Sequence, residues 1–216
     1  NNLEIYLNRF QHLGIKREEV YKNSEKYIKI IKKSNKEYFE EMEGISKGSD
    51  IPLKDIAILN ARWEIMYGGF SEKLGKEGCT SFGIQPERTI NNHTYLGQNW
   101  DWIPGLETFI MSVEREDKPN ILAFTEAGIV GGKIGVNEEG IGLTLNGLVS
   151  EKDGKNPYTK PMHVRFKEIL DSERMDKAIQ PIISEKRTVS SNIMLGHKSG
   201  EILNFEVGPD EYKVLY

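Results

Sequence analysis

Cys79 is the only cysteine in the chain, and it directly follows a glycine in the run Glu77-Gly78-Cys79-Thr80-Ser81. A single thiol can form neither an internal disulfide nor a thiolate metal cluster, so it is either a small buried apolar side chain or a nucleophile. Glycine lets another group approach its backbone carbonyl closely. The Cys79 thiol could therefore attack the peptide bond that precedes it. Cleavage there would leave Cys79 as a new N-terminus, with a free α-amine beside the sulfur.

A second group of chemically capable residues is the run Gly97-Gln98-Asn99-Trp100-Asp101-Trp102. An aspartate flanked by two tryptophans is unusual for a plain strand, because aspartate is depleted in strands. Asp101 could orient a positively charged amine, while Gln98 and Asn99 could hydrogen-bond a substrate carbonyl. The alternative, which the sequence leaves equally open, is that Asp101 caps a turn.

The third group is Asn146-Gly147, which closes a strand-like run. An amide side chain together with a glycine N–H could donate hydrogen bonds to an oxyanion, which is a large contribution to acyl transfer. An isolated Asn-Gly pair is also a common turn, and that interpretation stays open.

Other kinds of site find little support. None of the four histidines has a partner at metal-ligand spacing, so no metal is predicted, although a cysteine–histidine pair distant in sequence stays open. The glycines between 128 and 135 lack the dinucleotide fingerprint and are typical of a tight connection between strands, so no cofactor is predicted. The histidines are His12, His93, His163 and His197.

Composition excludes several classes of protein. The 216 residues are 38% hydrophobic and 29% charged, as in a soluble globular protein, and the net charge of −4 offers no basic surface for nucleic acid. No apolar run approaches the roughly 20 residues that span a bilayer, so no membrane partner is expected. One cysteine and no signal peptide favour a cytoplasmic location. A homo-oligomer is left open. The abrupt start inside a helical pattern and the stop within the strand-like run 212–216 indicate that segments are missing at both ends.

The elements that must position these residues change in type at Cys79. Apolar residues recur at helical spacing along 20–42, and Pro52 opens a second helix that carries Arg62 and Glu64, either paired inside the protein or solvated. After Cys79, short runs separated by turn residues predict an antiparallel meander, two helices near 162–170 and 175–183, and further strands. This order predicts an α+β fold. The expected strands are 80–85, 94–101, 108–114, 121–125, 133–136, 141–145, 192–197, 202–207 and 212–216.

Together these segments resemble the N-terminal nucleophile (Ntn) hydrolases of the isopenicillin N acyltransferase-like branch, the acyl-CoA:6-aminopenicillanic acid acyltransferases. That branch is related to the choloylglycine hydrolases, which carry an arginine where this chain has Gln98. The resemblance covers most of the chain. It is carried by Leu59-Asn60-Ala61-Arg62, Gly78-Cys79-Thr80, Gly97 to Asp101, Phe124 to Gly128, Asn146-Gly147-Leu148, Pro161 with His163, and Phe205-Glu206.

The resemblance implies a four-layer αββα sandwich with mainly antiparallel sheets and Cys79 at the start of a central strand. It implies one Ntn-hydrolase-like domain over 1–216, with a helical pro/α segment (1–78) and a β segment (79–216) that begins at the nucleophile. Cys79 would be freed by self-cleavage after Gly78, and Asp101 would lie near its α-amine. Asn146 would be an oxyanion or substrate-side residue. Ser190, or equally Ser191, would assist processing. The family's other oxyanion asparagine would lie beyond Tyr216.

The sequence therefore predicts a self-processing amidohydrolase or acyltransferase that acts through an acyl-enzyme on a small N-acyl amide or acyl thioester. Gln98, Asn99 and Trp100 are the expected substrate-binding residues. Two alternatives remain. One is a conventional cysteine hydrolase that does not cleave itself, and the other is a non-catalytic binding domain in which Cys79 is buried packing.

Overall fold

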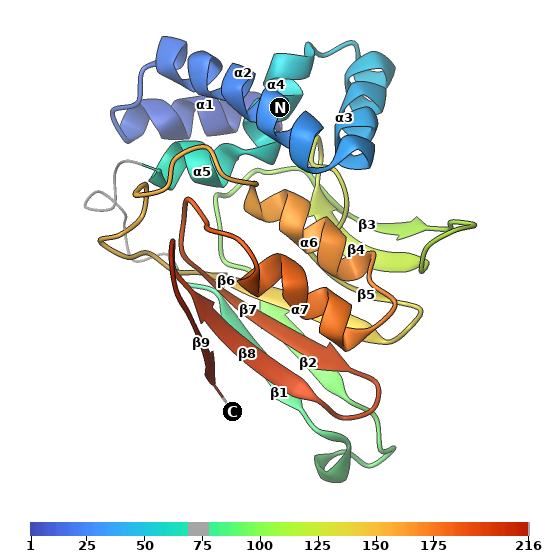
Figure 1. Cartoon of the computed structure of the whole chain (residues 1–216). Helices are drawn as coiled ribbons and strands as arrows, with labels where there is room; N and C mark the ends of the chain where they lie inside the picture. Colours follow the sequence, from blue (N-terminus) through green and yellow to red (C-terminus); the bar gives the residue numbers. More distant parts are fainter. Residues whose placement is uncertain (69–77, 216) are drawn as a thin grey trace.

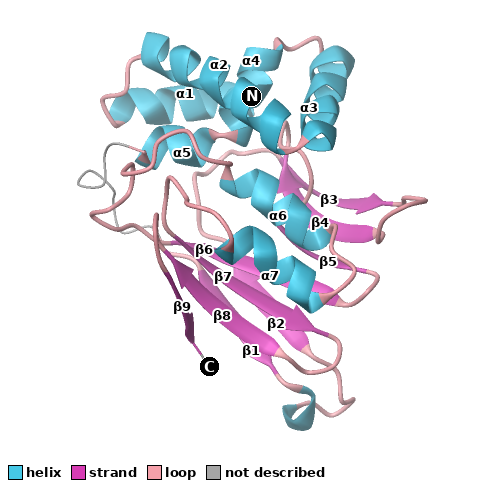
Figure 2. Ribbon diagram, in the orientation of Figure 1, coloured by secondary structure: helices cyan, strands magenta, loops and turns pink. Residues whose placement is uncertain are grey.

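The computed structural model describes residues 1–68 and 78–215, and it combines eight helical segments with nine strands in that part of the chain (Figures 1 and 2). The helices are α1 (Asn2–His12), α2 (Arg17–Ser34), α3 (Lys36–Ser49), α4 (Leu53–Asn60), α5 (Arg62–Tyr67), the 3₁₀ turn η2 (Pro86–Arg88), α6 (Met162–Leu170) and α7 (Met175–Ile183). The strands are β1 (Thr80–Ile84), β2 (Tyr95–Asn99), β3 (Thr108–Val113), β4 (Ile121–Glu126), β5 (Ile134–Asn137), β6 (Ile141–Gly147), β7 (Ser191–His197), β8 (Ile202–Val207) and β9 (Tyr212–Leu215).

The strands form two antiparallel sheets. Strands β3 to β9 lie in sequence order in a seven-stranded sheet, and β1 pairs with β2 in a separate sheet. The small sheet stacks on β6 and β7, where Leu96 enters a hollow above Gly142 and Gly196. A Cβ on Gly142 would lie 2.8 Å from Leu96 Cδ1, so a larger residue there would force the Leu96 side chain to shift.

Helices α6 and α7 lie along the other face of the large sheet, and α1 to α5 gather at one end of it (Figure 1). The predicted α+β class with mainly antiparallel strands is confirmed. Three layers are present in the described residues: α6–α7, the large sheet, and β1–β2. Phe82 and Tyr95, on the outer face of β1–β2, remain exposed. Cys79 directly precedes β1, which lies in the small sheet rather than at the centre of the large one.

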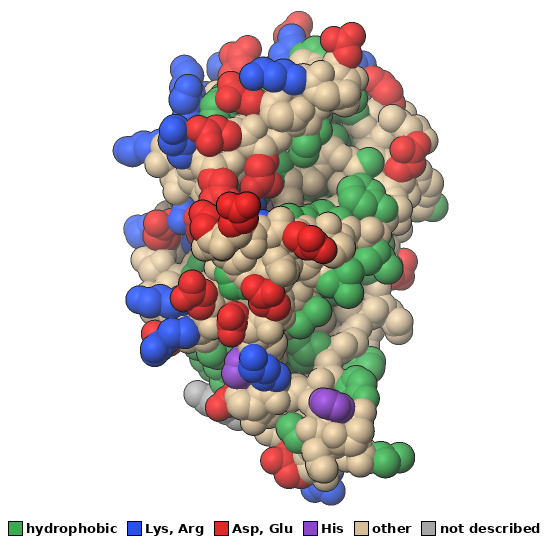
Figure 3. Space-filling model, turned by 90° about the vertical axis from the view of Figure 1, so that its right-hand side faces the viewer, with side chains coloured by type: hydrophobic (Ala, Val, Ile, Leu, Met, Phe, Trp, Pro, Cys, Tyr) green, Lys and Arg blue, Asp and Glu red, His purple; other side chains and the backbone are tan. Residues whose placement is uncertain are grey.

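The small sheet leaves part of the large sheet uncovered. Ile110 is 74% exposed and Leu122 is 53% exposed on neighbouring strands beside it. Figure 3, which views the side of the β3–β4 hairpin, shows hydrophobic side chains gathered on this face.

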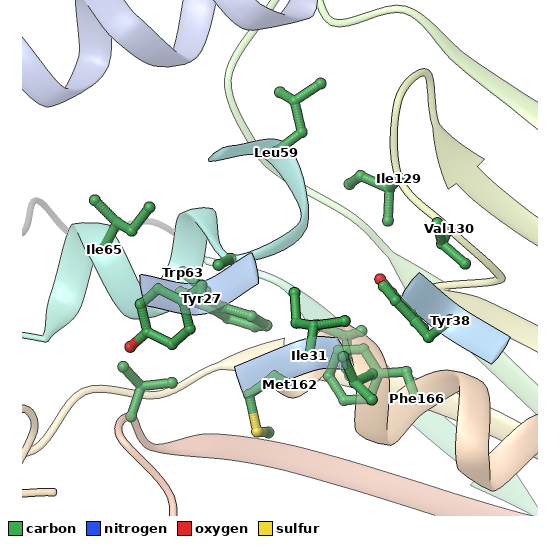
Figure 4. Packing of buried hydrophobic residues seen from close by; sticks show 14 of the residues in the cluster. Tyr27, Ile31, Tyr38, Leu59, Trp63, Ile65, Ile129, Val130, Met162 and Phe166 are labelled. Carbon is green, nitrogen blue, oxygen red and sulfur yellow. The ribbon is translucent and has the colours of Figure 1, made fainter. Parts of the chain in front are cut away.

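The N-terminal helices pack through one apolar cluster that continues into the sheet and α6. Tyr27 and Ile31 of α2 lie beside Trp63 of α5, and Met162 and Phe166 of α6 close the cluster from below (Figure 4). The helical pattern expected along 20–42 is divided between α2 and α3. The Asn35 side chain accepts a hydrogen bond from Tyr38 N at 2.9 Å and so begins α3, as an N-cap asparagine does.

Candidate active site

Cys79 lies on the wall of a cavity of about 70 Å³ between α5, the β2–β3 connection and the ends of β5 and β6. Its thiol is partly exposed, and Sγ donates to the backbone oxygen of Asp101 at 3.6 Å. Trp100 and Trp102 line the same cavity on either side of Asp101. The two clusters that the sequence analysis singled out around Cys79 and Asp101 thus meet in one place.

The remaining walls are largely apolar. Trp63 and Met66 contribute from α5, and Leu145 and Leu148 contribute from the end of β6. An apolar wall of this kind excludes water from a bound acyl group and strengthens electrostatic interactions within the cavity.

A buried charged cluster forms the cavity's inner side. Lys133 and Arg62 both bind Glu126 Oε1, at 2.5 Å and 2.7 Å, and Tyr6 donates its hydroxyl proton to Glu126 Oε2 at 2.5 Å. Trp102 Nε1 in turn donates to the Tyr6 hydroxyl at 2.8 Å. All four members of the Glu126 cluster (Tyr6, Arg62, Glu126, Lys133) are at most 4% exposed. The cluster therefore connects α1, α5, β4 and the start of β5 directly beneath the two tryptophans.

Burial and neighbouring charges together shift the pKa values of Lys133 and Glu126. Burial lowers the pKa of Lys133 to about 7, and the neighbouring Arg62 guanidinium adds to this effect. Burial would raise the pKa of Glu126, but the charges of Arg62 and Lys133 outweigh it and hold the pKa of this carboxyl below its usual value. Glu126 is therefore an ionised acceptor, as its three donors require.

The loop that carries Lys133 is fixed by Asn60 of α4. Its fully buried amide donates to Gly128 O at 2.8 Å and accepts from Val130 N at 2.9 Å. Gly128 has φ +94, where a side chain would be strained. The glycine-rich segment is thus a tight β4–β5 connection, as the sequence predicts, and it places Lys133 against Trp100.

The predicted oxyanion residue Asn146 lies on β6, facing β1. Its Nδ2 lies 2.7 Å from Ser81 Oγ and 2.9 Å from Asn192 Oδ1, and its buried Oδ1 has no hydrogen-bond partner among the described residues. Ser81 lies on β1, two residues after Cys79. Asn146 therefore contacts the beginning of β1 close to Cys79 in sequence, although it does not line the cavity.

Gln98 and Asn99 are placed differently from Trp100. The Gln98 side-chain amide makes two hydrogen bonds to the backbone of Leu145, accepting from Leu145 N at 2.9 Å and donating to Leu145 O. Gln98 thus ties β2 to β6, and neither it nor the exposed Asn99 lines the cavity. Of the three predicted substrate-binding residues, Trp100 alone reaches the cavity wall.

The predicted processing residues lie apart. Gly78 is exposed, with no atom within 4 Å of the position that a Cβ would occupy. Ser190 is buried, and its hydroxyl lies 2.6 Å from Asp153 Oδ1 and 2.9 Å from Ser150 Oγ. Its neighbour Ser191 pairs with the cavity residue Gly147 across β6 and β7. Glu77 and Tyr216 lie outside the described residues.

No histidine among the described residues lines the cavity. His163 is buried and hydrogen-bonded to Arg62, and burial, with the charge of Arg62, lowers its pKa well below the usual value. Within residues 1–68 and 78–215, no group of three or more His, Cys, Asp or Glu side chains could hold a metal ion, and no helix has the length and hydropathy of a membrane span.

The sequence left open whether Arg62 and Glu64 are solvated or have partners inside the protein. Both side chains are buried. Sequence reasoning missed Lys133 and Tyr6. A signal for Lys133 existed, because a lysine between a Gly-Gly pair and an apolar strand occupies a position where a charge needs a partner.

Comparison with known proteins identifies the family of this chain. The family model described as acyl-coenzyme A:6-aminopenicillanic acid acyl-transferase matches residues 88–215, a range that begins after Cys79 and includes Asp101, Lys133 and Asn146. The chain is 28% identical over 182 residues to the 40 kDa form of acyl-coenzyme A:6-aminopenicillanic-acid-acyltransferase from Emericella nidulans. That match covers 83% of this chain and 48% of the fungal protein, so the chain spans about half the length of this relative. Since the family model covers more than half of the chain, the protein belongs to the acyl-coenzyme A:6-aminopenicillanic acid acyl-transferase family.

Proposed function

We propose that the protein is a self-processing acyltransferase or amidohydrolase with Cys79 as its N-terminal nucleophile, acting on a small N-acyl amide or acyl thioester. The observation that carries this proposal is a thiol on an apolar cavity whose described lining contains no histidine. A cysteine in such a place needs another base. Cleavage between Gly78 and Cys79 would supply one, namely the α-amine of Cys79 itself.

After cleavage, Cys79 would supply both the nucleophile and the base. An α-amine has a reference pKa of about 7.7–8.0, so near neutral pH it can accept the thiol proton. The sulfur then bonds to the substrate carbonyl carbon, and the protonated amine returns the proton to the leaving group as the C–N or C–S bond breaks. Water or an acceptor amine attacks the resulting thioester and releases Cys79.

Asp101 and Asn146 have supporting roles in this proposal. The Asp101 backbone oxygen already contacts Sγ, and its carboxylate on the cavity wall would hold the α-ammonium after cleavage. Asn146 would exchange its hydrogen bond to Ser81, which is two residues from Cys79, for one to the oxyanion. Ser190 would assist the cleavage step. We place the reaction in the cytoplasm, because a single free cysteine suits a reducing compartment.

The test uses the full-length protein with Cys79→Ala and Cys79→Ser variants. Intact mass spectrometry should find two fragments that meet at Gly78/Cys79 in the wild type, and one uncleaved chain in Cys79→Ala. Wild type should release acyl product from a panel of N-acyl amino acids, penicillin V and acyl thioesters, and Cys79→Ala should not. Cys79→Ser should cleave slowly, because a hydroxyl is the poorer nucleophile near neutral pH.

Three results would count against the proposal. Normal cleavage of the alanine variant would assign processing to another protease. An uncleaved wild type that still releases product would favour a conventional cysteine hydrolase instead. Failure of wild-type Cys79 to react with a thiol reagent, with no product formed, would indicate a binding domain.

A further inference from the structure

Lys133 is the most deeply buried charge on the cavity wall. The side chain is 2% exposed, and its Nζ lies 3.8 Å from the centroid of the Trp100 ring. An ammonium group has three N–H donors. Among the described residues, Glu126 is the one acceptor within hydrogen-bond distance of Nζ. Donors of Lys133 are therefore left for a group inside the cavity that also contains Cys79.

The charges around Lys133 do not balance. Glu126 is one carboxylate between two cations, and its Oε1 accepts from both Arg62 and Lys133. The Arg62 guanidinium also lies 4.9 Å from the centroid of the Tyr6 ring and contacts Leu59 O and His163, none of which is a carboxylate. A buried charge without a full counterion is costly, and an anionic ligand would remove that cost.

The other charged and titratable groups nearby do not supply the missing counterion. Asp101 lines the cavity but is exposed to solvent, where its charge is screened. Tyr6 is buried and already donates to Glu126, and burial raises its pKa, so it remains neutral. Cys79 and Lys133 line the same cavity, so a ligand bound there can contact both.

We propose that Lys133 binds a carboxylate of the substrate inside the Cys79 cavity and so selects acyl compounds that carry a carboxylate close to the scissile carbonyl. This inference rests on the proposed function, because it assigns part of the substrate to that site. The carboxylate can come from the leaving amine, as in an N-acyl amino acid, or from the acyl group, as in a dicarboxylic monoamide. Both would place an anion against the same ammonium.

The test compares substrates that differ by one charge. On the amine side the pair is N-phenylacetylglycine and N-phenylacetylglycinamide. On the acyl side it is a glutaric monoanilide and its methyl ester. For each pair, kcat/KM of the acid is divided by that of the neutral compound in the full-length protein. For the pair whose carboxylate reaches Lys133, we expect this ratio to fall about 10- to 100-fold in Lys133→Met. That is the scale of one charge-assisted hydrogen bond.

Two further variants keep the result interpretable. Lys133→Gln retains a donor to Glu126 without the charge, and it should lower the same ratio. It therefore provides the test if Lys133→Met is too unstable to purify. Lys167→Met removes another buried ammonium, 3% exposed and paired with Asp171 at 2.8 Å, that does not line the cavity. Its ratio should equal that of the wild type. An unchanged ratio in both Lys133 variants, for both substrate pairs, would overturn the proposal.

A binding measurement separates this inference from the proposed function. The Cys79→Ala protein is titrated calorimetrically with each acid and its neutral partner. If the wild type turns over neither the acids nor their neutral partners, the proposed function fails. Tighter binding of an acid that is lost in Cys79→Ala/Lys133→Met would still support the subsite. Equal affinity for acid and neutral partner in both proteins would refute it.

Discussion

Glu64 on α5 is a buried carboxylate whose replacement should stabilise the protein at alkaline pH. The side chain is 3% exposed, and its Oε1 accepts from Met162 N at 2.7 Å. Its Oε2 is buried and has no hydrogen-bond partner among the described residues. Burial raises the pKa of Glu64 to about 7. Glu64→Gln keeps an oxygen for Met162 N and removes the charge.

The expected change in the free energy of unfolding follows from the change in the pKa of Glu64. Raising a carboxyl pKa from 4.5 to about 7 corresponds to about 3 kcal/mol of folding free energy. A raised pKa means that the folded state holds the proton between these values. The stability contributed by the protonated form is therefore complete below pH 4.5 and is lost as the pH rises through 7. Glu64→Gln should thus raise the free energy of unfolding by up to about 3 kcal/mol at pH 8 and by little at pH 4.5.

The assay is urea unfolding followed by tryptophan fluorescence, at pH 4.5 and pH 8. All proteins carry Cys79→Ala so that self-cleavage cannot divide the chain. Glu19→Gln, at an exposed position on α2, is the control and should change stability by less than about 0.5 kcal/mol at either pH. An equal effect of Glu64→Gln at both pH values, or a loss of stability at pH 8, would refute the reasoning.

Three further predictions concern the site. Arg62→Met leaves Glu126 paired with Lys133 but removes the guanidinium hydrogen bonds to Glu126 and Leu59 O, and it should lower the free energy of unfolding by about 1–3 kcal/mol in the same urea assay; an unchanged or higher stability would contradict this prediction. Asn146→Ala and Asp101→Asn should fold normally by circular dichroism yet lose most turnover of the acyl substrate, by about 10²–10³ for Asn146→Ala, the cost of one oxyanion donor; wild-type rates would make those two assignments wrong. Ser190→Ala should slow self-cleavage in a time course of intact mass, and cleavage at the wild-type rate would remove Ser190 from the processing step.

Much of the fold could be predicted because its signals are local. The strands from Thr80 onward follow apolar runs interrupted by turn residues, and the observed bounds differ from the expected ones by a residue or two at most positions. The boundary between α2 and α3 was missed because helical spacing continues across Asn35, where an extended backbone and the side-chain cap on Tyr38 N divide the two helices.

The site was predictable only in part, because its partners are distant in sequence. Cys79, Asp101 and Trp100 were identified from unusual residue types, and they share one cavity. Gln98 was expected at the substrate, but sequence could not show that the Leu145 backbone occupies its amide. Lys133 meets Trp100 and Glu126 through tertiary packing alone, so its place in the cavity had no periodic signature.

The most direct test of the central claim is the mass of the trapped acyl-enzyme. Full-length protein is mixed with an acyl thioester, quenched in acid within a turnover, digested and mapped by mass spectrometry. We predict that the acyl mass is added to the peptide that begins at Cys79, and that Cys79→Ala gains none. An acyl group on any other residue, or an adduct that persists in Cys79→Ala, would contradict the assignment of Cys79 as the nucleophile.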